Sequence, residues 1–117
     1  MLDLGDKQDC ICKKYDSVPK ECVNEYRFRD VGKQIQLKPN VKETTTLIAI
    51  DHCLITTNKK SRCDCLFIYE KENQTYSFLT ELKGRGEIEK SFGQLSKTRE
   101  YDEYKKIIKH FNIPTKN

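Results

Sequence analysis

Two acids and a lysine stand at the ends of two apolar segments in "CDCLFIYEKENQTYSFLTELKG", residues 63–84. Asp64 opens the first segment, and Glu81 and Lys83 close the second. Two carboxylates without a histidine form an oxygen-rich site of the kind that Mg²⁺ or Mn²⁺ prefers. A nearby lysine can position a water or stabilise charge that develops on a phosphate. These residue types together fit the hydrolysis of a phosphodiester bond.

The pattern of the two segments predicts a β-hairpin that brings the acids together. A register that pairs Asp64 with Glu81 has its centre between Glu72 and Asn73, inside the polar stretch that separates the segments. The same register makes four further pairs: Phe67 with Phe78, Tyr69 with Tyr76, Leu66 with Leu79, and Ile68 with Ser77. Cross-strand aromatic pairs stabilise a sheet, and a slip of one residue would mix its two faces.

In this register the two acids face each other with Cβ atoms about 5 Å apart, and Lys83 lies on the same face. Two carboxylates at that distance repel unless a cation, the lysine or a proton offsets their charge. Cys63 and Cys65 point to the opposite face, so we expect them to be core residues and not metal ligands.

The motif resembles that of the PD-(D/E)xK nuclease superfamily. Asp64 is followed after sixteen residues by Glu81-Leu82-Lys83, then by Gly84 and a helical segment that carries Gln94. The resemblance covers roughly residues 45–100. It implies an α/β, restriction-endonuclease-like fold, in which helices flank a central mixed β-sheet. It also implies that Asp64 and Glu81 bind the metal, that Lys83 assists catalysis, and that Gln94 makes a polar contact.

The chain departs from the family pattern in two places. Cys63 stands where the nominal motif has proline, and the first tyrosine after Gln94 is Tyr101, so the Gln-xxx-Tyr signature of the RecB-like branch is missing. An acid of the first helix often completes the site in the family, and Glu21 or Glu25 could supply it. Asp51 is a further candidate for an auxiliary acid, because it alternates with Leu47 and Ala49 and would end a strand near the same site.

A second Glu-x-Lys tripeptide, Glu103-Tyr104-Lys105, lies in a segment with helical periodicity. Side chains two residues apart on a helix point in different directions, so this tripeptide does not form a comparable site. A Glu-x-Lys tripeptide alone therefore does not indicate a function. The position of Glu81-Leu82-Lys83 at the end of a strand, facing Asp64, is what distinguishes it.

The composition fits one globular domain, residues 1–117, with residues 44–100 as the core that carries the motif. Apolar residues make up 36% of the chain, charged residues make up 34%, and the net charge is +4. No run of 18 apolar residues and no signal-peptide pattern occurs, so we expect a cytoplasmic protein without a membrane partner. The six cysteines without an export signal favour reduced thiols over a disulfide framework. A zinc site that uses the N-terminal cysteines is an alternative.

The periodicities predict where the elements lie. Residues 1–43 carry weaker patterns, with a short helix in "SVPKECVNEYRF" and a strand over residues 33–38. The stretch from Thr44 to Ile55 reads as a buried strand, and amphipathic helices follow within residues 87–111. The two strands of the hairpin are expected over residues 62–69 and 75–83.

The leading hypothesis is a Mg²⁺- or Mn²⁺-dependent endonuclease, or a related hydrolase, whose substrate is DNA. A homodimer is a possible arrangement of so short a chain. The alternative is a non-catalytic nucleic-acid-binding or structural module in which lysines offset the acids. A degenerate, inactive relative of the nucleases and a cysteine-ligated zinc protein are further alternatives.

Overall fold

The computed structural model describes residues 2–13, 19–30, 32–56, 63–82 and 98–113. Within these residues, six strands form two antiparallel sheets of three strands each, accompanied by one α-helix and one 3₁₀ helix. The elements are η1 (Gly5–Cys10), β1 (Cys22–Asn24), β2 (Arg27–Asp30), β3 (Lys33–Gln36), β4 (Glu43–Ala49), β5 (Cys65–Lys71), β6 (Gln74–Thr80) and α2 (Asp102–His110).

The main sheet has the strand order β4-β5-β6. Its central strand β5 is buried on both faces from Cys65 to Ile68, as expected for a continuous apolar run. The register between β5 and β6 is the predicted one, with Phe67 opposite Phe78 and Leu66 opposite Leu79. The hairpin prediction is therefore confirmed at the level of individual residue pairs.

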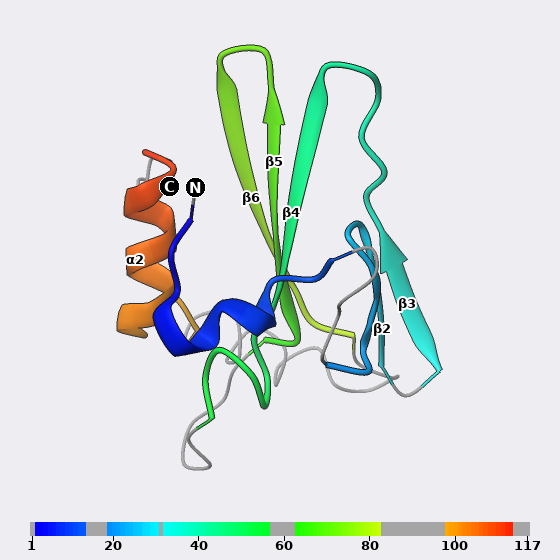
Figure 1. The fold of residues 1–117 in the computed structure, drawn as a ribbon, viewed down its shortest axis with the longest axis vertical. Coiled ribbons are helices and arrows are strands. Elements are labelled where there is room, and N and C mark those ends of the chain that lie inside the picture. Colours follow the sequence, from blue (N-terminus) through cyan, green and yellow to red (C-terminus); the bar gives the residue numbers. More distant parts are fainter. Residues whose placement is uncertain (1, 14–18, 31, 57–62, 83–97, 114–117) are drawn as a thin grey trace.

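Each face of the main sheet packs against a different layer (Figure 1). One face buries Ile48, Leu66 and Ile68 against the N-terminal segment and against Ile107 of α2. The other face buries side chains of β4 and β5 against the second sheet, in a cluster that comprises Cys12, Cys22, Phe28, Leu47, Ala49, Cys65 and Phe67. Alternation along the strands divides the core into these two parts.

The second sheet has the order β1-β2-β3 and replaces the helix expected near the N-terminus. Cys22 and Phe28 are opposite each other in β1 and β2 and are buried, whereas Val23 between them in the chain is exposed. This alternation is that of a strand, and the helical prediction for "SVPKECVNEYRF" is wrong. The strand predicted over residues 33–38 is confirmed as β3.

The predicted fold class is also wrong. The described residues form a mostly β domain, with two small antiparallel sheets and one short α-helix, and not a mixed sheet flanked by helices. The main reason is the N-terminal part, where a second sheet occupies the face that a flanking helix would cover in an α/β fold. The helical pattern of residues 87–97 lies outside the described residues.

Strand β4 ends earlier than the apolar stretch that predicted it. After Ala49 the chain turns, His52 adopts a left-handed φ of 63°, and the amide of Ile55 donates to the carbonyl of Ile50 at 3.0 Å. Leu54 and Ile55 return into the core by this route. The apolar run from 44 to 55 thus contains one strand and one buried turn.

Helix α2 lies within the stretch that was predicted to be helical and buries Ile107 and Ile108. Acidic residues occupy its first turn and basic residues its last, as the helix dipole favours. No helix among the described residues is long and apolar enough to cross a membrane.

Four of the six cysteines form disulfides, Cys10 with Cys53 and Cys12 with Cys22, so the expectation of reduced thiols is wrong for these four. The bond between Cys10 and Cys53 joins η1 to the turn after β4 and spans 43 residues of sequence. The sequence could not indicate these pairs, because they depend on the path of the N-terminal segment across the main sheet.

The long-range disulfide should contribute strongly to stability. Replacing both Cys10 and Cys53 by alanine should lower the free energy of unfolding by about 4 kcal/mol, because a loop of this length gains entropy in the unfolded chain. Urea denaturation of the oxidised proteins measures the difference. A thiol titration of the denatured wild type should find two free thiols, those of Cys63 and Cys65, and a count of six would contradict the pairing.

Candidate functional site

Asp64 and Glu81 lie at the same end of the main sheet, directly before β5 and directly after β6. The amide of Asp64 donates to the carbonyl of Thr80 at 3.0 Å, and the carbonyl of Asp64 accepts from the amide of Ile50 at 3.0 Å. The backbone of Asp64 is therefore held by both neighbouring strands, which continues the register of the sheet by one residue.

The side chain of Asp64 is oriented from within the protein. The residue is only 6% exposed, and its Oδ2 atom accepts a hydrogen bond of 2.7 Å from the amide of Leu82. Its carboxyl group also makes a hydrogen bond with the carboxyl group of Glu81, whose Oε2 atom is buried. The two predicted metal ligands thus face each other at the end of the hairpin.

A hydrogen bond between two carboxyl groups requires that one of them carry a proton. Burial is the largest influence on Asp64 and raises the pKa of its carboxyl group above the usual range. The hydrogen bonds with Leu82 and Glu81 act in the opposite direction, and the negative charges of Asp30 and Asp51 raise the pKa further. A proton shared by the two carboxyl groups would occupy the place between them that a cation could take.

Asp51, which the sequence offered as a candidate auxiliary acid, lies beside the pair. Its amide lies 3.4 Å from the carbonyl of Asp64, and its Oδ2 atom lies 3.6 Å from Nε2 of His52. Asp30, at the end of β2, acts on Asp64 electrostatically from the second sheet. Acids at the ends of four strands of the two sheets, β2, β4, β5 and β6, therefore lie close enough to act on one region.

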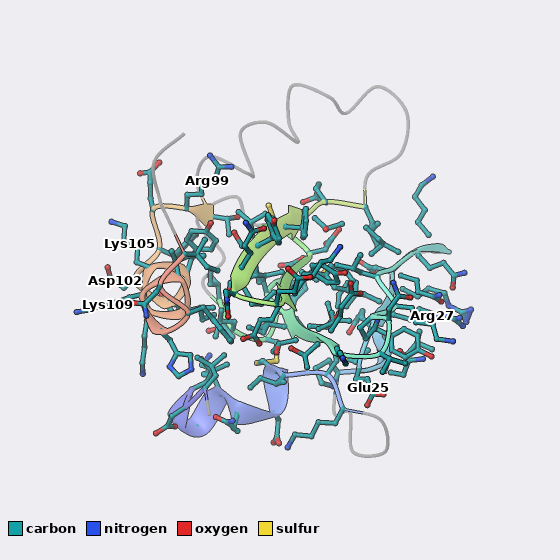
Figure 2. All side chains as sticks on the ribbon, turned by 90° about the horizontal axis from the view of Figure 1, so that it is seen from above. Glu25, Arg27, Arg99, Asp102, Lys105 and Lys109 are labelled. Atoms are coloured by element: carbon teal, nitrogen blue, oxygen red, sulfur yellow. A yellow bond between two sulfur atoms is a disulfide. The ribbon has the colours of Figure 1, made fainter. Side chains whose placement is uncertain are left out.

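The other predicted site residues are not brought to the pair by the described part of the chain. Glu25 is exposed in the turn between β1 and β2, beside Arg27 and across the molecule from Arg99 (Figure 2). The family pattern expects an auxiliary acid on a helix, and Glu25 lies on a hairpin instead. Lys83 and Gln94 lie outside the described residues.

The cysteines beside Asp64 are core residues, as predicted. Cys63 and Cys65 are fully buried free thiols, and Cys65 is opposite Thr80 on the face away from the acids. Burial raises the pKa of the Cys63 thiol to about 11 and raises the pKa of Cys65 even more. These thiols are therefore neutral at physiological pH in the metal-free protein.

Three residues near the pair were not found from the sequence. Thr98 is buried, and its Oγ1 atom accepts a 2.7 Å hydrogen bond from the amide of Cys63. The next residue, Arg99, is close enough to lower the pKa of Cys63 and so brings a positive charge to the site. The position of Asp30 at the end of an alternating segment could have marked it as a candidate. The sequence does not indicate that the two sheets pack against each other, so it does not place Asp30 near Asp64.

The acid pair alone offers a small set of metal ligands. No group of three or more histidine, cysteine or acidic residues among the described ranges is arranged to hold a metal ion. Two carboxylates nevertheless fit Mg²⁺ or Mn²⁺, because these ions keep several waters and need few protein ligands. The donor set contains neither imidazole nor thiolate and therefore does not fit zinc.

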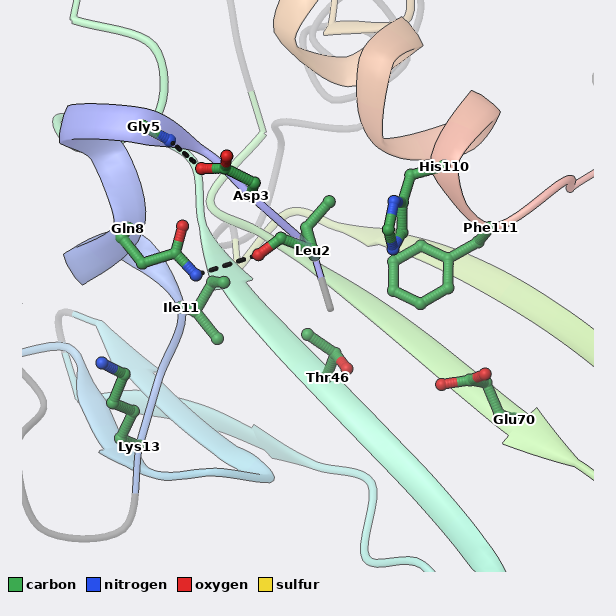
Figure 3. Close-up of a pocket in the computed structure, with 10 residues that line it drawn as sticks. All are labelled: Leu2, Asp3, Gly5, Gln8, Ile11, Lys13, Thr46, Glu70, His110 and Phe111. Carbon is green, nitrogen blue, oxygen red and sulfur yellow. Dashed lines mark hydrogen bonds between the residues drawn. The ribbon is translucent and has the colours of Figure 1, made fainter.

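A hollow of about 1020 Å³ lies elsewhere on the same side of the main sheet (Figure 3). Its lining comes from the N-terminal segment, from Thr46 and Glu70 on the main sheet, and from His110 and Phe111 at the end of α2. Glu70 is six residues from Asp64 along the chain, which corresponds to about 20 Å of extended strand. The hollow does not contain the acid pair.

Comparisons of the chain with protein-family models, with curated proteins and with solved structures found no match. The geometry of the acid pair is therefore the basis for a functional assignment.

The raised pKa of Asp64 makes folding stability depend on pH. The folded protein holds the Asp64 proton more tightly than the unfolded chain does. The contribution of Asp64 to the free energy of unfolding is therefore greatest below its unfolded-state pKa. It falls as the pH rises through the higher folded-state pKa. In an Asp64→Asn variant, the new amide group would still accept from Leu82 and could donate to Glu81 without a proton from solvent.

We therefore expect Asp64→Asn to stabilise the metal-free protein at pH 7.5 by about 1 kcal/mol, or ~4 °C in Tm. The gain should disappear at pH 3, where the wild type carries the proton. Thermal denaturation in EDTA measures both values, and Asp9→Asn, an exposed acid, is the matched control. A variant that is less stable than the wild type at pH 7.5 would show that the pair is an ordinary structural contact.

Proposed function

We propose that this protein is a divalent-metal-dependent nuclease that hydrolyses DNA phosphodiester bonds at Asp64 and Glu81. The observation that carries the proposal is the placement of two carboxyl groups face to face, one directly before β5 and one directly after β6. Such a pair costs stability as long as no cation lies between the acids. Retention of this destabilising pair at the end of an otherwise apolar hairpin is consistent with a role in metal binding.

The chain's own groups would prepare the site before a metal binds. The amide of Leu82 holds the Asp64 carboxylate in one orientation, and burial limits its contact with solvent. Loss of the shared proton frees both carboxylates to coordinate Mg²⁺ or Mn²⁺. When bound, such an ion supplies a Lewis acid that polarises the phosphate and lowers the pKa of water.

Lys83 is the proposed catalytic lysine. It is two residues beyond Glu81, so the alternation of an extended segment would put it on the face of the acids. From that position an ammonium group stabilises negative charge on the phosphate or orients the attacking water. The resemblance of this Glu-x-Lys unit to the PD-(D/E)xK nucleases supports the same role. The family's fold is not part of the proposal.

A second candidate function is supported by the hydrogen bond between the acids. A proton shared by the two acids offsets their repulsion without a metal, so the pair could serve only to join the ends of β5 and β6. The protein would then be a non-catalytic nucleic-acid-binding or structural module, as the alternative hypothesis states.

The cytoplasmic location also stays a proposal, and the disulfides bear on it. Disulfides persist in oxidising compartments and are rare in the cytosol, where thiol reductants keep cysteines reduced. The pairs Cys10–Cys53 and Cys12–Cys22 therefore favour an oxidising environment, whereas the residue pattern of the chain led to the cytoplasmic prediction.

The nuclease proposal predicts metal-dependent cleavage of labelled DNA, tested on single-stranded, duplex and branched substrates with Mg²⁺ or Mn²⁺. Asp64→Asn, Glu81→Gln and Lys83→Ala should each lower the rate by about 100-fold or more, since each removes a metal ligand or a charge-stabilising group. Cleavage of a circular single strand would identify an endonuclease.

The second Glu-x-Lys tripeptide supplies matched controls. Glu103→Gln and Lys105→Ala change the same residue types on the exposed surface of α2 and should leave the rate within twofold of the wild type. Absence of cleavage by the wild type on all substrates would contradict the proposal. Equal rates for the site variants and the controls would do so as well.

A further inference from the structure

Three aromatic rings form a ladder on the face of the hairpin opposite the acids. The ring centroids of Tyr69 and Tyr76 are 6.3 Å apart, and those of Tyr76 and Phe78 are 6.5 Å apart. The planes of Tyr76 and Phe78 are within 27° of parallel. Tyr76 is 42% exposed and Phe78 is 47% exposed, so two neighbouring rings of β6 present their surfaces to solvent.

The orientation of these rings is fixed by their neighbours. The hydroxyl of Tyr69 is hydrogen-bonded to Glu43, which raises the pKa of this tyrosine to about 12. The hydroxyl of Tyr76 donates to Oε1 of Gln74 in the same strand. Phe78 is opposite the buried Phe67 across the hairpin. A ligand that stacks on these rings would therefore find them already ordered, which reduces the entropic cost of binding.

The strand that carries the exposed rings is unusual for its position in the sheet. Within the described residues β6 is an edge strand, with β5 as its neighbour. Edge strands are commonly protected by lysine, proline or other charged residues, whereas Gln74–Thr80 contains no charged residue and no proline. The exposed aromatic side chains of this uncharged edge strand can stack on other flat rings.

We propose that the Tyr69–Tyr76–Phe78 ladder binds single-stranded nucleic acid by stacking bases on Tyr76 and Phe78. Stacking on ordered aromatic side chains is how proteins bind single strands with little sequence preference. Lys71 follows Tyr69 on the same face of β5, and its side chain is 55% exposed although it forms an ion pair with Glu43. The net charge of +4 permits a polyanion. The same charge disfavours a second copy of the chain as the occupant.

This inference rests on the proposed function, because it specifies that the substrate of the proposed nuclease site is single-stranded. Phe78 and Glu81 belong to the same edge segment and are three residues apart, about 10 Å along an extended chain. Their side chains lie on opposite faces. A strand stacked on the ladder would therefore reach the acids by passing around the end of β6.

Binding can be measured separately from cleavage, by fluorescence anisotropy of labelled 15-nucleotide single strands in EDTA at low salt. Separate titrations with single-stranded DNA and RNA measure the preference for deoxyribose or ribose. Duplex DNA of the same sequence tests whether binding requires unpaired bases. The wild type should bind the single strand at least tenfold more tightly than the duplex. Tyr76→Thr combined with Phe78→Thr should weaken single-strand binding at least tenfold.

Val41→Thr removes an apolar side chain that is 90% exposed outside the ladder and should leave the affinity unchanged. Threonine retains the strand preference of β6, and circular dichroism verifies that the double variant is folded. The chain contains no tryptophan, so its emission comes from its six tyrosines. Quenching of this emission by single strands should be smaller in the double variant.

Three results would overturn the inference: no single-strand binding by the wild type, equal affinity of the ladder variant, or equal loss in Val41→Thr. Wild-type dimerisation that the double threonine variant abolishes, seen by sedimentation, would assign the ladder to a second copy and would overturn it too. Binding without cleavage by any form would contradict the nuclease proposal and leave the ladder as a binding surface.

Discussion

Burial of β5 on both faces is the constraint on which the rest of the structure depends. Cys65 and Phe67 pack against the second sheet, while Leu66 and Ile68 pack against the N-terminal segment and α2. A strand with apolar contacts on both sides cannot shift by one residue without exchanging the layers that it faces. The register with β6 is therefore fixed, and the position of Asp64 one residue before the strand is fixed with it.

The same burial gives the acid pair its chemistry. Asp64 is removed from water because it continues a buried strand, so its pKa is raised and it forms a hydrogen bond with Glu81. A carboxyl group in such an environment destabilises the folded protein at neutral pH compared with a group that needs no proton. On our proposal, a divalent cation bound between the two carboxylates would remove the repulsion between them and so stabilise the folded protein. The fold and the proposed activity are then linked through one desolvated carboxylate.

The hairpin could be predicted from the sequence because its signals are local. Alternating apolar residues, a polar turn and two aromatic pairs agree on one register, and the structure has that register. The inward orientation of Cys63 and Cys65 followed from the same alternation. Predictions of this kind succeed where neighbours along the chain are also neighbours in the sheet.

The N-terminal part could not be predicted in the same way, because its structure depends on contacts between distant segments. Cys22, Val23 and Tyr26 fit a helical face as well as a strand, and the pairing of Cys22 with Phe28 decides between them. The disulfide between Cys10 and Cys53 and the approach of Asp30 to Asp64 require the same long-range arrangement. The predicted α/β fold was wrong for this reason, and the position of the acid pair did not depend on it.

The central claim is that Asp64 and Glu81 share a divalent cation, and anomalous X-ray scattering from a crystal soaked in MnCl₂ tests it most directly. The account predicts an anomalous difference peak within coordination distance of oxygens from both carboxylates in the wild type, and no peak there in Glu81→Gln. A wild-type crystal at neutral pH in which the two carboxyl groups remain hydrogen-bonded to each other, with no peak between them, would contradict it.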